Sequence, residues 1–318
     1  MPSRCHFDRR RIALACHFDR RRVAPQWRNL CQCSGFLATL RMMYVSPKMA
    51  KGRIDLEGIA MRQQSLVLTI AYDGTAYAGF AKQKDEHVVT IQGELERALA
   101  TYFRHPVETV CAGRTDAGVH ALGQVVSCVL DEAEFEDITP SRLVISLNAL
   151  TPDDIAIKNV RFDVPTFSAR FDARSREYRY RIVTGSVPPL FLRRYAWWRK
   201  GLLDIEAMRQ GATHLIGEHD FKSFCKAASA EGKTTMRCVN EVSIELEEQM
   251  GEECLVIKVI GNAFLHSMVR TIVGTLAQVG AGHRDPAWVA EVLAACDRSA
   301  AGETAPACGL TFWHVNYG

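Results

Sequence analysis

The sequence predicts an α+β protein with two similar subdomains, in which helices flank largely antiparallel sheets. Runs of alternating or β-branched apolar residues predict strands in both halves of the chain, and runs with a period of about 3.6 residues predict helices. Strands and helices follow one another in a similar order in each half. We therefore place a boundary near Phe167, between an N-terminal subdomain of residues 61–166 and a C-terminal subdomain of residues 167–318.

The N-terminal subdomain begins with a predicted strand over residues 66–71, which ends in the turn Tyr72-Asp73-Gly74-Thr75. One face of residues 91–103 is apolar at helical spacing, and Thr90 stands before it as an N-cap. Further strands are predicted over residues 107–111, 124–130 and 155–162.

The C-terminal subdomain repeats this alternation. Strands are predicted over residues 178–183, 242–246 and 255–261, with a helix over residues 205–215. A second helix is predicted over residues 264–279. Apolar residues cover so much of its circumference that we expect it to be largely buried, with Arg270 in its middle.

Composition excludes several classes of protein. The chain has 318 residues and is 47% hydrophobic, which excludes disorder throughout. No run approaches the roughly 18 apolar residues of a membrane span, and we find no secretion signal. The eleven cysteines lack the paired spacing of a disulfide framework, so we expect reduced, mostly buried thiols in a cytoplasmic protein without a membrane partner.

Charge is distributed unevenly along the chain. Residues 1–60 carry 12 Lys and Arg against 4 Asp and Glu, a net 12 − 4 = +8, whereas the other 258 residues carry 27 against 32, a net 27 − 32 = −5. A nucleic-acid partner would therefore need a local basic surface. Residues 170–200 offer nine basic residues interleaved with aromatic ones, a pattern typical of RNA-binding surfaces, although a solvated strand face is the alternative.

The first sixty residues look foreign to the rest. The sequence Cys-His-Phe-Asp-Arg-Arg-Arg occurs at residues 5–11 and again at 16–22. The two Cys-His pairs lack zinc-ligand spacing, so we expect no metal site. We interpret residues 1–60 as a disordered basic extension or a mis-called start, with the true start at Met61 or nearby; a transit segment and a basic RNA-binding arm are the alternatives.

The most informative stretch is Ala-Gly-Arg-Thr-Asp-Ala-Gly-Val-His-Ala, residues 112–121. Two glycines flank Arg114 and Asp116 in a loop between predicted strands, and glycine lets a backbone approach a ligand closely. The loop would present Asp116 to a ligand. The alternative is a turn in which this Asp bonds its own backbone.

Arg270 favours the functional interpretation of Asp116. A buried guanidinium needs an anionic partner, and an Asp on a glycine-flanked loop can supply one. Such pairing keeps a carboxylate ionised and oriented, as a nucleophile or general base requires. A structural salt bridge is the alternative. His266, expected one turn earlier on the same helical face as Arg270, is interpreted as a packing or hydrogen-bonding residue and not as a catalyst.

These residues together resemble the TruA-type pseudouridine synthases, from about Leu66 to the C-terminus. The motifs that carry the resemblance are Tyr72-Asp73-Gly74-Thr75 with Tyr77, Gly79 and Phe80; the stretch over residues 112–121; Phe167-Ser168-Ala169-Arg170 leading to Tyr178-Arg179-Tyr180; and Phe264-Leu265 with Met268-Val269-Arg270 and Val273-Gly274. One departure is Ala81, where the family usually has Gln.

The resemblance implies the pseudouridine synthase fold and isomerisation of uridine at positions 38, 39 and 40 of the tRNA anticodon arm. It implies that Asp116 attacks the target nucleotide, that Arg270 pairs with Asp116, that Tyr178 stacks on the base and that Arg114 helps to extrude it. We expect Arg170 and Arg179 to contact the tRNA. No cofactor is implied, because the same base leaves and returns, and the family implies a homodimer spanned by the tRNA.

Two other classes of function are the alternatives. A non-catalytic RNA-binding module would show sheet aromatics without any need for an Arg–Asp pair. An unrelated Asp-dependent enzyme would normally show a second carboxylate, a metal cluster or a phosphate-binding glycine loop, and none stands at an informative spacing. The sequence favours the synthase.

Overall fold

The computed structural model describes residues 63–318 apart from 86, 137 and 227–230. The predictions for residues 1–60 and for a start at Met61 therefore lie outside the described residues. The strands are β1 Gln63–Tyr72, β2 Val110–Cys111, β3 His120–Asp131, β4 Ile155–Asp163, β5 Ser175–Thr184, β6 Trp197–Arg199, β7 Gly217–Asp220, β8 Met236–Gln249, β9 Glu252–Gly261 and β10 Leu310–Asn316.

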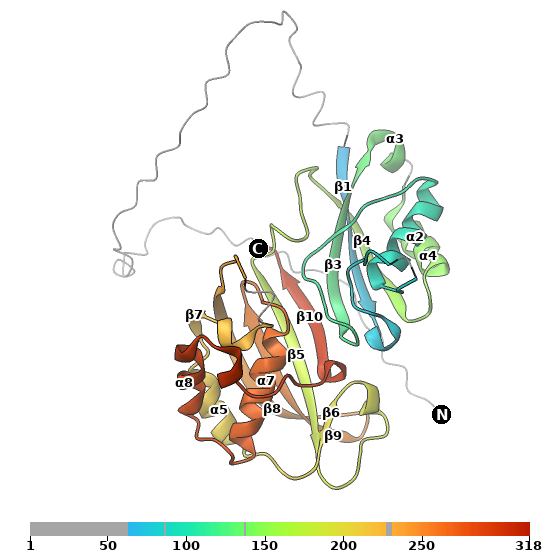
Figure 1. Cartoon of the computed structure of the whole chain (residues 1–318). Helices are drawn as coiled ribbons and strands as arrows, with labels where there is room; N and C mark the ends of the chain where they lie inside the picture. The colour runs from blue at the N-terminus through green and yellow to red at the C-terminus, as the bar shows by residue number, and fades with distance from the viewer. Residues whose placement is uncertain (1–62, 86, 137, 227–230) are drawn as a thin grey trace, which may run out of the picture. The chain divides into compact units, whose positions relative to one another are not determined.

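All of these strands join one ten-stranded sheet with the order β4-β1-β3-β10-β5-β9-β8-β7, to which β2 adds beside β3 and β6 beside β5. Neighbouring strands are antiparallel except that β10 runs parallel to β3 and β6 parallel to β5. Figure 1 shows β10 lying between β3 and β5, where it connects the strands of the two halves. The predicted α+β class is confirmed, and the division near Phe167 stays a prediction.

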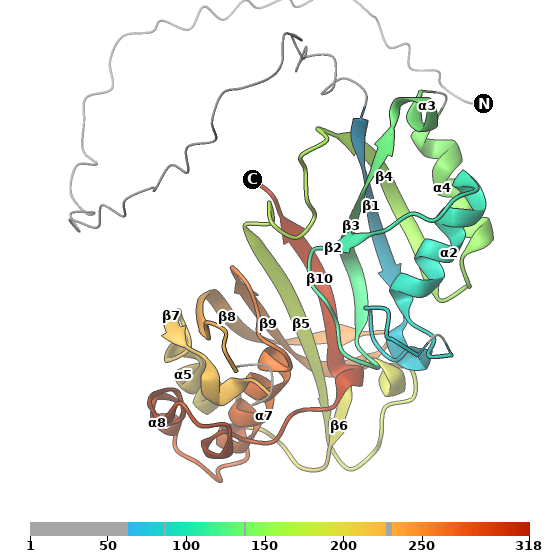
Figure 2. The same cartoon turned by 45° about the horizontal axis from the view of Figure 1, so that its top comes forward.

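The helices pack beside the sheet in two groups. They are α2 Ile91–Phe103, α3 Glu132–Phe135, α4 Pro140–Leu150, α5 Ile205–Thr213, α7 Met268–Gly280 and α8 Trp288–Ala295. Figures 1 and 2 show α2 and α4 beside β1 and β4, whereas α5, α7 and α8 gather near β5, β8 and β9. The central strands thus run between two groups of helices.

Local sequence explains the helix that was predicted best. In α2, Ile91, Leu95 and Leu99 are buried along one face, as the helical spacing indicates. The Thr90 side chain accepts a hydrogen bond from the Gly93 backbone N–H at 3.2 Å, so the predicted N-cap is confirmed.

The helix predicted over residues 264–279 begins later than expected. Ser267 has the left-handed backbone angles φ 61° and ψ 9°, which no helical residue adopts, so α7 begins at Met268. His266 therefore precedes the helix, and the prediction that it shares a helical face with Arg270 is wrong. The strand predicted over residues 107–111 is also shorter, because only Val110–Cys111 pairs with β3.

Candidate active site

The loop between β2 and β3 carries Asp116, and a buried glutamine fixes where it begins. Gln124 on β3 donates its amide Nε2–H to the Gly113 carbonyl at 2.6 Å and accepts the Gly113 N–H at 3.4 Å. A Cβ at Gly113 would lie 2.9 Å from the Phe312 ring and 3.4 Å from the Tyr178 hydroxyl. Glycine is required here because the loop lies directly on the aromatic side chains of the sheet.

Thr115 anchors the loop a second time, just before Asp116. Its hydroxyl lies 2.8 Å from the Tyr72 hydroxyl, and its carbonyl accepts the Phe80 N–H at 3.0 Å. Gly79 passes so close that a Cβ there would lie 3.0 Å from the same carbonyl, at a φ of 111° that favours glycine. The predicted motifs around Tyr72 and Gly79 therefore hold the backbone on which Asp116 stands.

Three side chains surround the Asp116 carboxylate. Arg270 Nη1 donates to Oδ2 at 2.9 Å, and the Ser267 hydroxyl donates to the same oxygen at 2.9 Å. On the other side, His266 Nε2 lies 3.2 Å from Oδ1. The Asp116 side chain keeps 24% of its surface exposed. The carboxylate is thus oriented by several groups and still accessible from the cleft described below.

The predicted ion pair between Arg270 and Asp116 is present. Arg270 stands in the first turn of α7 and keeps 18% of its side-chain surface exposed, so it is less deeply buried than its predicted place in mid-helix implied. Its Nε donates to the Ala305 carbonyl at 2.8 Å, and the Ala305 N–H donates to the Arg270 carbonyl at 3.1 Å. The Nε bond fixes the guanidinium at a second point besides Asp116, and the backbone bond ties Arg270 to the segment around Ala305.

Tyr178 lies on β5 beneath the loop. Its ring packs edge-on against Phe264, with centroids 5.0 Å apart, and against Phe312, with centroids 4.9 Å apart. Burial raises the pKa of the phenol well above its ordinary value, so the hydroxyl stays neutral. The position suits a ring that supports a flat apolar ligand.

These elements enclose a cleft of about 780 Å³ over the middle of the sheet. Asp116 is its one acidic residue among the residues that the structure describes. Its basic side chains are Lys82, Arg114, Arg170, Arg176, Lys233 and Arg237. Residues 61–318 carry a net charge of −5, yet the cleft wall is strongly cationic, as a polyanionic ligand requires.

The predicted RNA contacts separate into two groups. Arg114 and Arg170 are exposed and line the cleft. Arg179 does not line it: its Nε donates to Glu177 at 2.7 Å, and its guanidinium lies 4.0 Å from the centre of the Trp313 ring. Successive side chains of a strand point to opposite faces of a sheet, so Arg179 faces away from Tyr178. Its role as a tRNA contact stays a prediction.

Sequence reasoning gave Arg176 no role of its own. Its buried guanidinium donates to the carbonyls of Ala112, Arg170, Ala173 and Asn262. These carbonyls belong to the Asp116 loop, the segment before β5 and the segment before α7. Burial lowers the pKa of this guanidinium. The available signal was the alternation Arg176, Tyr178, Tyr180, which gives all three one face of β5.

Ser267 was also missed, and His266 was expected only to pack or to form hydrogen bonds. Both precede α7, and their contacts with Asp116 depend on the left-handed turn at Ser267. The motif Phe264-Leu265 pointed to this segment, but its spacing was interpreted as helix.

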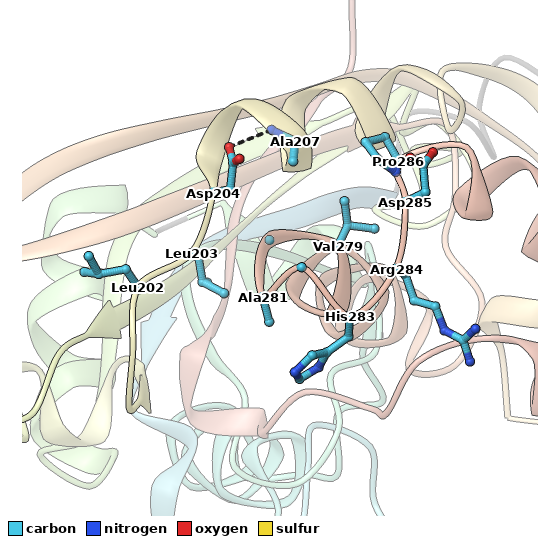
Figure 3. Close-up of a pocket in the computed structure, with 12 residues that line it drawn as sticks. Leu202, Leu203, Asp204, Ala207, Val279, Ala281, His283, Arg284, Asp285 and Pro286 are labelled. Carbon is cyan, nitrogen blue, oxygen red and sulfur yellow. Dashed lines mark hydrogen bonds between the residues drawn. The ribbon is translucent and has the colours of Figure 1, made fainter.

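A second hollow lies at the other end of α7. It measures about 740 Å³ and is lined by residues 202–204, 279–286 and Ala207. Figure 3 shows His283 and Arg284 extending from the segment after α7, and Asp204 capping α5 through its bond to the Ala207 N–H. Asp204 and Asp285 stand among its polar groups, whereas the predicted site residues Arg114, Asp116, Arg170 and Tyr178 line the other cleft.

Within residues 63–318, leaving aside the gaps given above, no helix is long and apolar enough to span a membrane. The same described residues contain no group of three or more His, Cys, Asp or Glu that could hold a metal ion. Their seven cysteines are free thiols, of which Cys128, Cys225 and Cys254 are buried and four are partly buried.

The structure thus has a cationic cleft with an oriented aspartate, on a mixed and mostly antiparallel sheet. The sequence was also compared with protein families. The family described as tRNA pseudouridine synthase matches residues 68–172 and 212–318. The chain belongs to this family. It is therefore an enzyme of the isomerase class, which converts uridine to pseudouridine.

Particular relatives agree. The tRNA pseudouridine synthase A of Brevibacillus brevis is 47% identical over 249 residues, which cover 78% of this chain and 97% of that protein. The synthase of the same name from Exiguobacterium sp. is 43% identical over 253 residues, 79% of this chain and 96% of that protein. The tRNA pseudouridine synthase A of Fervidobacterium nodosum is 45% identical over 252 residues, which cover 79% of this chain and 98% of that protein.

Proposed function

We propose that this chain isomerises uridine to pseudouridine in tRNA at positions 38, 39 and 40 of the anticodon arm, with Asp116 as the catalytic carboxylate. The observation that carries the proposal is the Asp116 carboxylate itself. It is bonded to Arg270 at 2.9 Å and is the one acidic group on a cleft wall with six basic residues, among the residues that the structure describes. Such a wall binds phosphates, whereas the acid can act on a nucleotide held between them.

The net reaction breaks one bond of the nucleotide and forms another. Asp116 attacks the target nucleotide and forms a transient bond to it, and the glycosidic bond between C1′ of the ribose and N1 of the uracil breaks. The freed uracil rotates in the cleft, its C5 bonds to C1′, and the transient bond to Asp116 breaks, which returns the free carboxylate. The proton on C5 is then lost and N1 gains a proton, so atoms and charges balance without a cofactor. Arg270 and Ser267 hold Asp116 through Oδ2 during these steps.

The base must leave the RNA stack before it can reach Asp116. Extrusion costs a few kcal/mol, and stacking on an aromatic ring returns about 1–3 kcal/mol per base. Tyr178, held edge-on by Phe264 and Phe312, supplies a ring in the cleft. Arg114 is exposed on the loop two residues before Asp116, where it can take the place of the extruded base.

A tritium-release assay tests the proposal. Loss of the C5 proton releases tritium from tRNA that carries [5-³H]uridine. We expect release by the wild-type chain and none by Asp116→Asn, while tRNA binding by Asp116→Asn persists. The matched control is Asp163→Asn, because Asp163 also pairs with an arginine but lies on the edge strand β4.

Normal release by Asp116→Asn would overturn the role of this carboxylate. To locate the sites, tRNA substrates with cytidine at position 38, 39 or 40 are compared by carbodiimide mapping of pseudouridine. Modification confined to other positions would overturn the anticodon-arm assignment and leave the chemistry in place.

We also propose a homodimer in the cytoplasm, with one tRNA spanning both subunits. The resemblance to the TruA-type synthases supports both parts. Light scattering after gel filtration is expected to give twice the 35.5 kDa mass of the chain. A monomer that is fully active at all concentrations would contradict the dimer.

A further inference from the structure

Ser267 has an unusual backbone for its position. It is the N-cap of α7, where an extended conformation is the rule, yet its φ is 61° and its ψ is 9°. Three other non-glycine residues with positive φ occur in the described chain. Arg104 and Cys296 end helices, and Met250 stands in a hairpin turn, all places where left-handed residues are common. Ser267 begins a helix instead.

The side chain of Ser267 does not compensate for this strain within its own helix. A serine N-cap usually accepts a hydrogen bond from the backbone of the first helical turn, but Ser267 makes no such bond. Its hydroxyl donates instead to Asp116 Oδ2 at 2.9 Å, across 151 residues of sequence. The local conformation is unfavourable and the long-range bond is kept, a pattern found at functional sites.

The turn also arranges the neighbouring donors. The left-handed residue Ser267 stands between His266, whose Nε2 lies 3.2 Å from Asp116 Oδ1, and Arg270, whose Nη1 donates to Oδ2 at 2.9 Å. The His266 carbonyl accepts the Lys226 N–H at 3.2 Å, which fixes this segment from outside the helix. Two donors on Oδ2 restrict rotation of the carboxylate more than Arg270 alone could.

We propose that Ser267 is a positioning residue: its hydroxyl fixes the orientation of the Asp116 carboxylate for the reaction. The inference rests on the proposed role of Asp116. Ser267 acts through that carboxylate and not on the substrate, and its left-handed backbone is retained because this conformation directs the hydroxyl to Oδ2. A misplacement of about 1 Å at a catalytic group can lower a rate about 100-fold.

Two substitutions separate positioning from a structural role. Ser267→Gly removes the hydroxyl and relieves the left-handed strain, whereas Ser267→Ala removes the hydroxyl and keeps the strain. We expect both to lower the single-turnover rate of tritium release about 10- to 100-fold with an unchanged dissociation constant for tRNA. The melting temperature should fall for Ser267→Ala and stay at or above wild type for Ser267→Gly.

If the turn were only structural, activity would follow stability, and Ser267→Gly would keep the wild-type rate; that result overturns the inference. Ser267→Asn gives a third arm, because asparagine tolerates the left-handed region and its amide can donate to Asp116. We expect it to retain more activity than Ser267→Gly. If Ser267→Asn and Ser267→Gly lost the same activity, the hydrogen bond to Asp116 would not be the cause of the loss, and the inference would be overturned.

The matched control is Cys296→Gly, which relieves a left-handed residue with φ 47° at the end of α8, outside the lining of the cleft. Its rate should equal wild type, with a melting temperature at or above wild type. Failure of this inference is distinguishable from failure of the proposed function. Wild-type turnover by Asp116→Asn defeats both, whereas an inactive Asp116→Asn beside a fully active Ser267→Gly defeats this inference alone.

Discussion

Two regions of the sequence suggested RNA chemistry: the loop over residues 112–119 and the basic stretch over residues 170–200. Their side chains are placed differently in the structure. The loop is anchored at three points: Gly113 bonds to Gln124 on β3, Thr115 contacts Tyr72 on β1 and bonds to Phe80, and the Asp116 side chain bonds to Ser267 and Arg270. The basic stretch divides between the two faces of β5. Arg176 lies at the cleft and Arg179 faces away from it.

The difference follows from what each sequence feature specifies about the structure. A glycine-flanked motif specifies backbone conformation, and backbone conformation fixes where its side chains point. A count of basic residues contains no such constraint, because the alternation of a strand sends neighbouring residues to opposite faces. Charge density along a strand therefore overestimates the charge on either face.

Arg270→Leu should show the largest effect, because Arg270 is the cation bonded to Asp116. The variant tests whether the loop that carries Asp116 depends on this ion pair. The substitution removes the bond to Asp116 Oδ2 and the bond to the Ala305 carbonyl. We expect single-turnover tritium release to fall by about 100- to 1,000-fold, the range typical of losing one preorganised electrostatic contact. The free energy of unfolding should also fall, because a partly buried carboxylate loses its cation. Arg298→Leu, which removes an arginine bonded to the Gly302 carbonyl and Thr304, is the control and should keep the rate within a few-fold.

Arg176→Met and Arg179→Met compare the two faces of β5 directly. Arg176 donates to four carbonyls, including those of Ala112 and Asn262, so its loss should lower the free energy of unfolding by about 3 kcal/mol and loosen the Asp116 loop. Arg179 makes one partly exposed ion pair and one contact with the Trp313 ring, and its loss should change the free energy of unfolding by about 1 kcal/mol. Urea denaturation of both variants measures the difference. Equal losses would show that the face of the strand does not decide the role of its arginines.

Regular elements could be predicted wherever periodicity was long, as in α2 with its Thr90 cap or in β1. The Arg270–Asp116 pair could be predicted because a cation among apolar residues requires a partner. The position of β10 between β3 and β5 could not, because strand order depends on pairing between segments far apart in sequence. Nor could the role of Ser267, since no local pattern indicates a left-handed residue at the start of a helix.

Arg237→Ala tests whether the cleft or the basic stretch carries the phosphate contacts. Arg237 is a half-buried cation in the lining of the cleft, so its charge contributes to the potential that attracts a phosphate there. We expect weaker tRNA binding. The slope of log K against log salt concentration should fall by about 1, which corresponds to one lost phosphate contact. Filter binding at several salt concentrations measures the slope. Arg179→Ala tests the predicted contact on the other face of the sheet: an equal reduction of the slope would support that contact, whereas an unchanged slope would restrict the phosphate contacts to the cleft.

His120 connects the two regions and gives the smallest predicted effect. It is the next-to-last residue of the motif over residues 112–121, and its ring is buried: Nδ1 accepts the Gly74 N–H at 3.2 Å and Nε2 lies 3.0 Å from the Arg194 carbonyl in the basic stretch. Burial lowers its pKa, although neighbouring Asp73 acts in the opposite direction. The folded protein thus favours neutral His120, and its contribution to stability is complete above the unfolded pKa of about 6.5 and is lost as the pH falls through the lower folded pKa.

Thermal unfolding between pH 7.5 and 5 should therefore show a steeper loss of stability for wild type than for His120→Asn, whose side chain does not titrate. The expected difference is at most about 1 kcal/mol, since the bonds to Gly74 and Arg194 are partly replaced by the amide. Parallel curves for the two proteins would show that His120 takes up its proton without disturbing the fold. In that case the bonds from Arg176 to the Ala112 carbonyl would hold the basic stretch against the loop, and the contact between His120 Nε2 and the Arg194 carbonyl would not.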